Sequence, residues 1–144
     1  MLDYKDHEGL GFLITDVSRR LRHAFQVRII GSELTLAQAR ALLYLSRIPG
    51  LRQVELAEVL ELQPITVARL IDQLESTGLV ERRPDPSDRR AYKLYQTKKA
   101  DRYITDIERV ITGIRADALA DLNPEQVDMV FNVLHRMRDN LQDG

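Results

Sequence analysis

The segment from residue 63 to residue 97 restricts the fold of this chain more than any other part of the sequence. Within it, Pro64 to Thr77 carries apolar side chains at helical spacing, and they form one stripe: Val67, Leu70, Ile71 and Leu74. Pro64 suits the first turn of a helix, where its missing N–H is not needed. Gly78 stands where a helix commonly ends in the left-handed conformation, and Leu79 can fold back onto the last turn. The pattern predicts an amphipathic helix with defined ends.

The same segment predicts a basic hairpin after the helix. Leu79–Arg83 and Tyr92–Gln96 have the composition of two short strands, and the loop between them is rich in turn formers. That loop carries two adjacent guanidinium groups, from Arg89 and Arg90. The outer face of the helix carries a stripe of hydrogen-bonding side chains, formed by Thr66, Arg69 and Gln73. A helix with such a stripe, followed by a basic hairpin, is typical of a winged helix-turn-helix that binds DNA.

Each of these features has a simpler explanation when it is taken alone. A polar stripe on an amphipathic helix is usually its solvated face, and an arginine pair in a turn is usually solvated too. The combination is more specific, because the pieces follow one another in the order that a winged helix requires.

Three further helices are predicted before this segment. Leu10–Ile29 forms the first, and Thr35 can cap the second, Leu36–Arg47. Arg52–Leu60 forms a short third helix, and residues 61–63 make a tight turn into the helix described above. The last two helices are therefore the expected helix-turn-helix pair. The first-turn residues of the third helix, Arg52 and Gln53, could reach a phosphate.

Two helices are predicted after the hairpin. Thr97 can cap the first, which continues to Ala118 with a long apolar stripe. Asn123-Pro124-Glu125-Gln126 is a helix-start signal, and apolar residues follow at helical spacing to Leu141.

The apolar faces of the flanking helices predict an oligomer. A compact winged helix already has its own core, so these faces need another partner. Packing of the three helices against those of a second subunit, across a two-fold axis, would bury all three apolar faces. The alternative is that these faces pack against one another within one subunit. We expect a homodimer formed through the helices near residues 10–29, 98–120 and 124–141.

The expected organisation is mainly α with a small β-wing, a winged helix-turn-helix flanked by N- and C-terminal dimerisation helices. Residues 34–97 form the DNA-binding region, and residues 1–33 and 98–144 form the helical dimerisation region of a single composite domain.

Charge is distributed unevenly along the 144 residues, although the net charge is only −1. Eight basic and three acidic residues lie between Arg82 and Arg102, whereas four basic and eight acidic residues lie between Tyr103 and Gly144. One region can attract phosphates while the other repels them, which would orient the molecule on a polyanion.

Other function classes have little support in the sequence. The chain contains no cysteine, and His7, His23 and His135 lie far apart, so we expect no disulfide, no metal and no cofactor. No Gly-rich phosphate loop or nucleophile motif indicates an enzyme. No stretch is apolar enough to cross a membrane and the first residues lack a signal-peptide pattern, so we expect a cytoplasmic protein.

The segment from Leu34 to Thr97 resembles the MarR/SlyA family of bacterial transcriptional regulators. The residues that carry the resemblance are Leu34-Thr35, Gln38, Leu56-Ala57, Arg69, Leu74-Glu75, Gly78-Leu79-Val80, Arg82, Asp88, Arg90 and Thr97. The long flanking helices match the dimerisation parts of the family, so the resemblance covers nearly the whole chain. It implies a bacterial protein that associates with the nucleoid when it is bound to DNA.

The resemblance also implies roles for particular residues. The helix from Pro64 lies in the major groove and Arg90 enters the minor groove, where an A·T-rich sequence enhances the negative potential. Asp88 holds the Arg90 guanidinium through a paired hydrogen bond, and Arg89 contacts phosphate or shares the minor groove. The full set of expected DNA-binding residues is Arg52, Gln53, Gln63, Pro64, Thr66, Arg69, Gln73, Arg82, Asp88, Arg89 and Arg90.

A small aromatic acid or phenolic effector is the second expected ligand. Many relatives bind such molecules between the dimer helices and the DNA-binding lobe, close to the position of Ala39, where the family often has a bulky aromatic residue. The candidate lining residues are Phe12, Arg20, His23, Ala39 and Tyr44.

We therefore expect a sequence-specific regulator, acting as a repressor, that binds double-stranded DNA as a homodimer at a pseudo-palindromic operator and is released by such an effector. The alternative is a winged-helix protein-interaction module that does not bind DNA. A DNA-binding protein loses affinity steeply as salt rises, which distinguishes the two.

Overall fold

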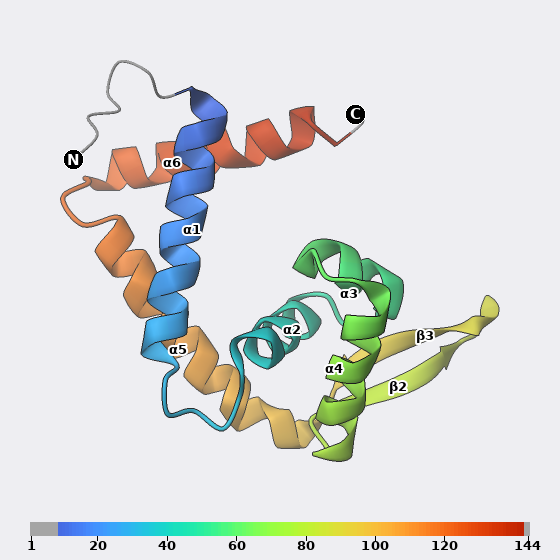
Figure 1. Ribbon diagram of the computed structural model, residues 1–144. Helices are drawn as coiled ribbons and strands as arrows, with labels where there is room; N and C mark the ends of the chain where they lie inside the picture. The colour runs from blue at the N-terminus through green and yellow to red at the C-terminus, as the bar shows by residue number, and fades with distance from the viewer. Residues whose placement is uncertain (1–8, 143–144) are drawn as a thin grey trace. The chain divides into compact units, whose positions relative to one another are not determined.

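The computed structural model describes residues 9–142, which form six α-helices and a small antiparallel sheet (Figure 1). The elements in chain order are α1 (Leu10–Arg28), α2 (Leu36–Arg47), β1 (Leu51–Arg52), α3 (Gln53–Leu60), α4 (Pro64–Ser76), β2 (Val80–Asp85), β3 (Asp88–Gln96), the 3₁₀ turn η1 (Lys98–Ala100), α5 (Asp101–Ala118) and α6 (Pro124–Asn140). The expected winged helix-turn-helix fold, mainly helical with a small β-wing, is confirmed.

The chain divides into two compact units within α5. The first ends at Ile111 and contains every strand and the helices α1 to α4, while the second begins at Thr112 and contains α6. No helix in the described part of the chain is long and apolar enough to span a membrane.

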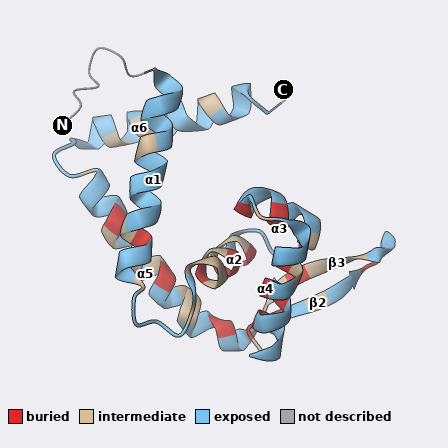
Figure 2. Cartoon of the chain, in the orientation of Figure 1, coloured by how far each residue is buried: buried red, intermediate tan, exposed pale blue. Residues whose placement is uncertain are grey.

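The core of the first unit lies between α2, α3, α4 and the sheet. Figure 2 shows the buried residues of α2, α3 and α4 gathered on the sides of the helices that face one another. The largest fully buried side chains are Leu42, Leu45, Leu56, Val67, Ile71, Leu74 and Leu94. Burial of each such side chain contributes about 1.5–3 kcal/mol, so this cluster holds the helix-turn-helix pair in a fixed geometry.

Helix starts follow the capping chemistry of the sequence. Thr35 accepts a hydrogen bond from the backbone of Gln38 at 3.2 Å, and the Gln38 side chain accepts one from the Thr35 backbone at 2.9 Å. Asn123 and Gln126 form the same reciprocal pair at 2.8 and 3.0 Å. Both capping boxes fix the first residue of a helix, and both starts are confirmed.

Tight terminations of α3 and α4 fix the direction in which the chain enters and leaves α4. Glu61 ends α3 in the left-handed region with φ 55°, and the chain enters α4 at Pro64. Gly78 follows α4 with φ 77°, and the backbone N–H of Leu79 returns to the carbonyl of Leu74 at 2.9 Å. A residue with a Cβ is strained at that φ, so glycine permits this tight termination.

The sheet has three strands, not the two expected, in the order β1-β3-β2. The third helix was expected to begin at Arg52, but Leu51 and Arg52 instead pair with Leu94 and Lys93 of β3. A strand of only two residues is too short to show a strand pattern in the sequence. The extended conformation of Leu51 and Arg52 depends on a partner strand more than 40 residues away in the sequence.

The wing strands are longer than expected, and the expected loop of residues 84–90 is mostly strand. The turn between β2 and β3 contains only Pro86 and Ser87, with an irregularity in pairing at Pro84/Asp85. Proline is tolerated here because β2 is an edge strand, where a missing N–H leaves no ladder bond broken. The hairpin therefore extends away from the helices (Figure 1).

Thr97 does not cap a helix with its side chain, contrary to expectation. Its hydroxyl donates to the carbonyl of Gly78, and its backbone N–H donates to the carbonyl of Leu79 at 3.0 Å. The residue thus ties the end of α4 to the start of η1, and α5 begins only at Asp101.

Candidate nucleic-acid interface

The face of α4 that points away from the core is polar at most positions. With about 100° between successive residues, the midpoint of the buried stripe lies opposite Ile65 and Arg69. Thr66 and Gln73 lie to one side of that line, towards α2, where Gln38 donates a 3.4 Å hydrogen bond to Gln73. The three residues of the predicted hydrogen-bonding stripe, Thr66, Arg69 and Gln73, are all exposed. The centre of the face is nevertheless displaced towards Ile65, which is not among the predicted DNA-binding residues.

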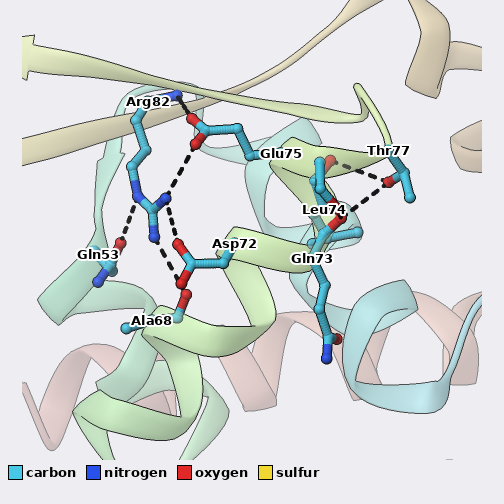
Figure 3. A network of polar contacts seen from close by, with 9 residues as sticks. Gln53, Ala68, Asp72, Gln73, Leu74, Glu75, Thr77 and Arg82 are labelled. Carbon is cyan, nitrogen blue, oxygen red and sulfur yellow. Dashed lines mark hydrogen bonds and ion pairs between the residues drawn. The ribbon is translucent and has the colours of Figure 1, made fainter.

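The opposite flank of α4 is joined to the wing through Arg82 (Figure 3). The Arg82 side chain is only 17% exposed, and it lies 2.7 Å from Asp72 and 3.2 Å from Glu75. Its guanidinium also donates to the Ala68 carbonyl and to the Gln53 side chain, each at 3.2 Å. One side chain therefore links α3, α4 and β2.

This geometry corrects the expected role of Arg82. Arg82 is among the predicted DNA-binding residues, but its guanidinium is directed into the protein and donates to Gln53, Glu75 and the Ala68 carbonyl. Gln53 shares the network, because its side-chain oxygen accepts from Arg82. The sequence of a short strand does not show whether a basic side chain points into the protein or towards solvent. The direction of the Arg82 side chain follows only from the pairing of β2.

Arg52 lies beside the wing turn. Its guanidinium forms an ion pair with Asp85 at 2.7 Å and lies 3.5 Å from the Ser87 hydroxyl, and its backbone N–H donates to Glu55. Gln63 and Pro64 are exposed at the start of α4.

Asp85 is the buried charge of the wing, and it is not among the residues predicted from the sequence. It is 3% exposed, and its carboxylate accepts hydrogen bonds from the Ser87 backbone at 3.0 Å and from the Ser87 hydroxyl at 2.8 Å. These bonds from Ser87, followed by the charge of Arg52, lower the pKa of the Asp85 carboxyl below its ordinary value of 3.8. An Asp two residues before Ser within a turn-forming sequence is the available signal for such a turn.

The tip of the wing presents free guanidinium groups. Arg89 and Arg90 are exposed, and their guanidiniums contact no partner among residues 9–142. Asp88 was expected to hold the Arg90 guanidinium, but its carboxylate instead accepts a 3.0 Å hydrogen bond from the Arg90 backbone N–H. The short side chain of Asp reaches the backbone two residues ahead more readily than the end of a long arginine, so it shapes the turn and leaves the guanidinium free.

Lower on the wing, Arg83 stacks on the ring of Tyr95 at 4.1 Å and pairs with Glu81 at 3.3 Å. The hydrogen bond to Glu81 is the main reason that the pKa of Arg83 is raised. This arginine remains positively charged on the strand surface below the free tip.

Comparison with known proteins identifies this arrangement. The model of the MarR family matches residues 34–92, which run from the start of α2 into β3. A solved structure of the transcriptional regulator PA3341 is 35% identical, covers 94% of this chain and 100% of its own, and superposes with a TM-score of 0.81. The chain belongs to the MarR family.

Two further structures have the same fold. A MarR crystal structure is 27% identical with a TM-score of 0.80, and the match covers 97% of this chain and 94% of that one. A MarR-family regulator from Listeria monocytogenes, solved in complex with a 26mer DNA, is 21% identical with a TM-score of 0.79. The match covers 94% of this chain and 91% of that one. The expected recognition as a MarR-type protein is confirmed, and this chain is a DNA-binding transcriptional regulator.

The five candidate effector residues lie on α1 and α2. Phe12, Arg20 and His23 are exposed on α1, and Arg20 pairs with Asp16 at 3.1 Å. The carboxyl of Asp16 has a lowered pKa, mainly through its hydrogen bond from Arg19 and then that from Arg20.

On α2, Tyr44 is half-buried, whereas Ala39 is 1% exposed and belongs to the core. Ala39 therefore cannot line a ligand site in this conformation, which corrects its expected role. A small residue at this position is consistent with close packing of α2 as well as with an enlarged pocket, and sequence alone does not distinguish the two.

Two clefts of the first unit lie elsewhere. One, of about 370 Å³, is lined by residues 28–34 and by one side of α5 that includes Arg102 and Tyr103. The other, of about 280 Å³, lies between α2 and α4 and includes Thr66, Arg69 and Gln73. Residues 9–142 contain no group of three or more His, Cys, Asp or Glu residues that could hold a metal ion, and His7 lies outside the described residues.

Proposed function

We propose that the protein is a homodimeric repressor that binds a pseudo-palindromic operator, with α4 in the major groove and the tip of the wing in the adjacent minor groove. The observation that carries this proposal is a pair of guanidiniums at the wing tip, those of Arg89 and Arg90, which have no partner among residues 9–142, together with a helix α4 that exposes Arg69. Arginine without an internal partner is available for phosphate, for the edge of guanine, or for a narrow minor groove.

The candidate residues divide into three roles. Thr66, Arg69 and Gln73 are the proposed base readers on α4, and Gln63 and Pro64 place the start of that helix against the backbone of the DNA. Arg89 and Arg90 act at the minor groove, where Asp88 shapes the turn that presents them. Arg52 and Arg82 hold the reading helix and the wing in register through their contacts with Asp85 and with Asp72 and Glu75, and Gln53 supports this role by accepting a hydrogen bond from Arg82.

The proposed dimer is formed by the helical regions of residues 1–33 and 98–144, outside the DNA-binding region of residues 34–97. Phe25 is the only buried residue of α1, and α6 has none. The exposed apolar side chains of these two helices are Leu10, Phe12, Leu13, Ile14, Val17, Leu21, Val27, Met129, Phe131, Val133 and Leu134. Such an amount of apolar surface is characteristic of an interface, and a two-fold arrangement buries the same surface on both subunits.

The proposed effector is a small aromatic acid or phenol that binds near Phe12, Arg20, His23 and Tyr44. Arg20 supplies a cation for a carboxylate, and Phe12 and Tyr44 supply aromatic surface. Such a ligand reduces DNA affinity only if it binds the dimer shape that does not fit the operator more tightly than the shape that does.

A selection from a random DNA pool tests the proposed function. We expect enrichment of an inverted repeat whose half-sites lie about one helical turn apart, with affinity that falls steeply as salt is raised. The selection is repeated with salicylate as the effector probe, and we expect weaker recovery of the same sequence. Failure to enrich any sequence at low salt contradicts the proposal and favours a protein-interaction module, while an unchanged recovery with salicylate contradicts this type of effector.

A further inference from the structure

We propose that Ile65 recognises the 5-methyl group of a thymine in the major groove of the operator. This inference rests on the proposed function, in which α4 enters that groove. It assigns a specificity-determining role to an exposed aliphatic side chain that packs against no core.

The position of Ile65 on α4 is the first argument. It is the second residue of the helix and is 63% exposed, at the point of the helix surface opposite the buried stripe. The exposed side chains around it are polar: Thr66, Arg69, Asp72, Gln73 and Ser76. A single exposed isoleucine is not unusual in itself, but this one stands at the centre of the face that is directed towards DNA.

The chemistry of the major groove is the second argument. The thymine methyl is the apolar group on a base-pair edge there, and apolar side chains contact it. Residues at the N-terminal end of a reading helix approach the base edges most closely. An aliphatic side chain at this position gains from burial against a methyl group, whereas against the polar edge of a G·C pair it removes hydration and returns no hydrogen bond.

The neighbouring Arg69 predicts where the thymine lies. Ile65 and Arg69 are separated by one helical turn, about 6 Å along the axis, and both point outward. Base steps are about 3.4 Å apart, so the two side chains reach bases within about two steps of each other. A guanine contacted by Arg69 through N7 and O6 should therefore have the contacted thymine within two base pairs.

The test removes the 5-methyl group from one thymine of the operator at a time. Each thymine of the selected operator is replaced in turn by deoxyuridine, which removes only the methyl group, and affinities are measured for the wild-type protein. We expect one position per half-site at which the replacement weakens binding about fourfold, the effect of losing one buried methyl. Ile65→Ala should bind the thymine and uracil operators equally, and Ile65→Val should retain part of the discrimination.

A matched control separates this contact from a general effect. Ile48→Ala removes the same atoms from another exposed isoleucine, outside α4 and outside the proposed dimerisation regions, and should leave the uracil profile unchanged. The inference is overturned if no thymine position is sensitive, or if Ile65→Ala retains the wild-type uracil profile. Absence of binding to any selected duplex is a different result, because it contradicts the proposed function.

Discussion

Replacement of Arg82 by methionine tests the arginine network that joins the reading helix to the wing. Methionine keeps most of the length of the side chain and removes all of its donors. Two of the lost bonds go to partly buried acceptors, the Ala68 carbonyl and the Gln53 side chain, and each contributes about 1 kcal/mol. The two carboxylates, Asp72 and Glu75, are 66% and 46% exposed, so each ion pair is screened and contributes only about 0.5 kcal/mol.

The expected loss in the free energy of unfolding for Arg82→Met is therefore about 2–3 kcal/mol, allowing for water that replaces some of the lost bonds. Urea unfolding at one fixed protein concentration measures it, since the apparent stability of a dimer depends on concentration. Arg83→Met is the matched control, because Arg83 is the next residue on β2 and is paired only on the surface. We expect a clearly smaller loss for it.

The same variant separates a positioning role from a DNA contact. If Arg82 acts through the network, Arg82→Met weakens operator binding without changing the dependence of affinity on salt. A stability loss equal to that of Arg83→Met, or a salt dependence reduced by about one phosphate contact, would refute the reasoning.

Three further predictions concern the wing and the reading helix. Arg90→Ala should weaken specific binding strongly, as measured by fluorescence anisotropy, because the tip loses its groove contact, and an unchanged affinity would remove Arg90 from the interface. Arg69→Ala should reduce the free energy of specific binding by about 1–3 kcal/mol and weaken the base preference at the contacted position. An equal loss of affinity for random DNA would instead show that Arg69 contacts phosphate. The Asp85 carboxyl should titrate below 3.8 when followed by NMR, and Ser87→Ala or Arg52→Met should raise that pKa. Because the folded pKa is lowered, the stabilisation is fully present above 3.8 and is lost only as the pH falls through the folded value, so operator binding should not vary with Asp85 charge near neutrality. A titration at or above 3.8 would contradict the hydrogen bonds assigned to it.

The helices could be predicted because their signals are local. Thr35 with Gln38 and Asn123 with Gln126 are capping pairs three residues apart, and Gly78 marks the end of α4 by its own conformational freedom. Each signal is complete within one turn of chain, so no knowledge of distant residues is needed.

The strands and the site could be predicted only in part, because distant partners decide them. Leu51 is extended because β3 pairs with it, and Arg82 points inward because Asp72 and Gln53 meet it there. The resemblance implies that Asp88 holds the Arg90 guanidinium, but its carboxylate instead accepts a hydrogen bond from the Arg90 backbone N–H. Ile65 carries no distinct sequence signal because the residues beside it form a polar stripe, although the helical period alone places it opposite the core.

Hydroxyl-radical footprinting of the purified protein on its selected operator tests the central claim most directly. Two subunits that each insert α4 and a wing tip should protect two equivalent half-sites about 10 base pairs apart, with protection continuing into the outer minor grooves. Removal of the wing-tip arginine by Arg90→Ala should erase the protection of the outer minor grooves and leave the protection of the sugar–phosphate backbone at the two half-sites in place. A single protected half-site, or a footprint that Arg90→Ala does not alter, would contradict the account.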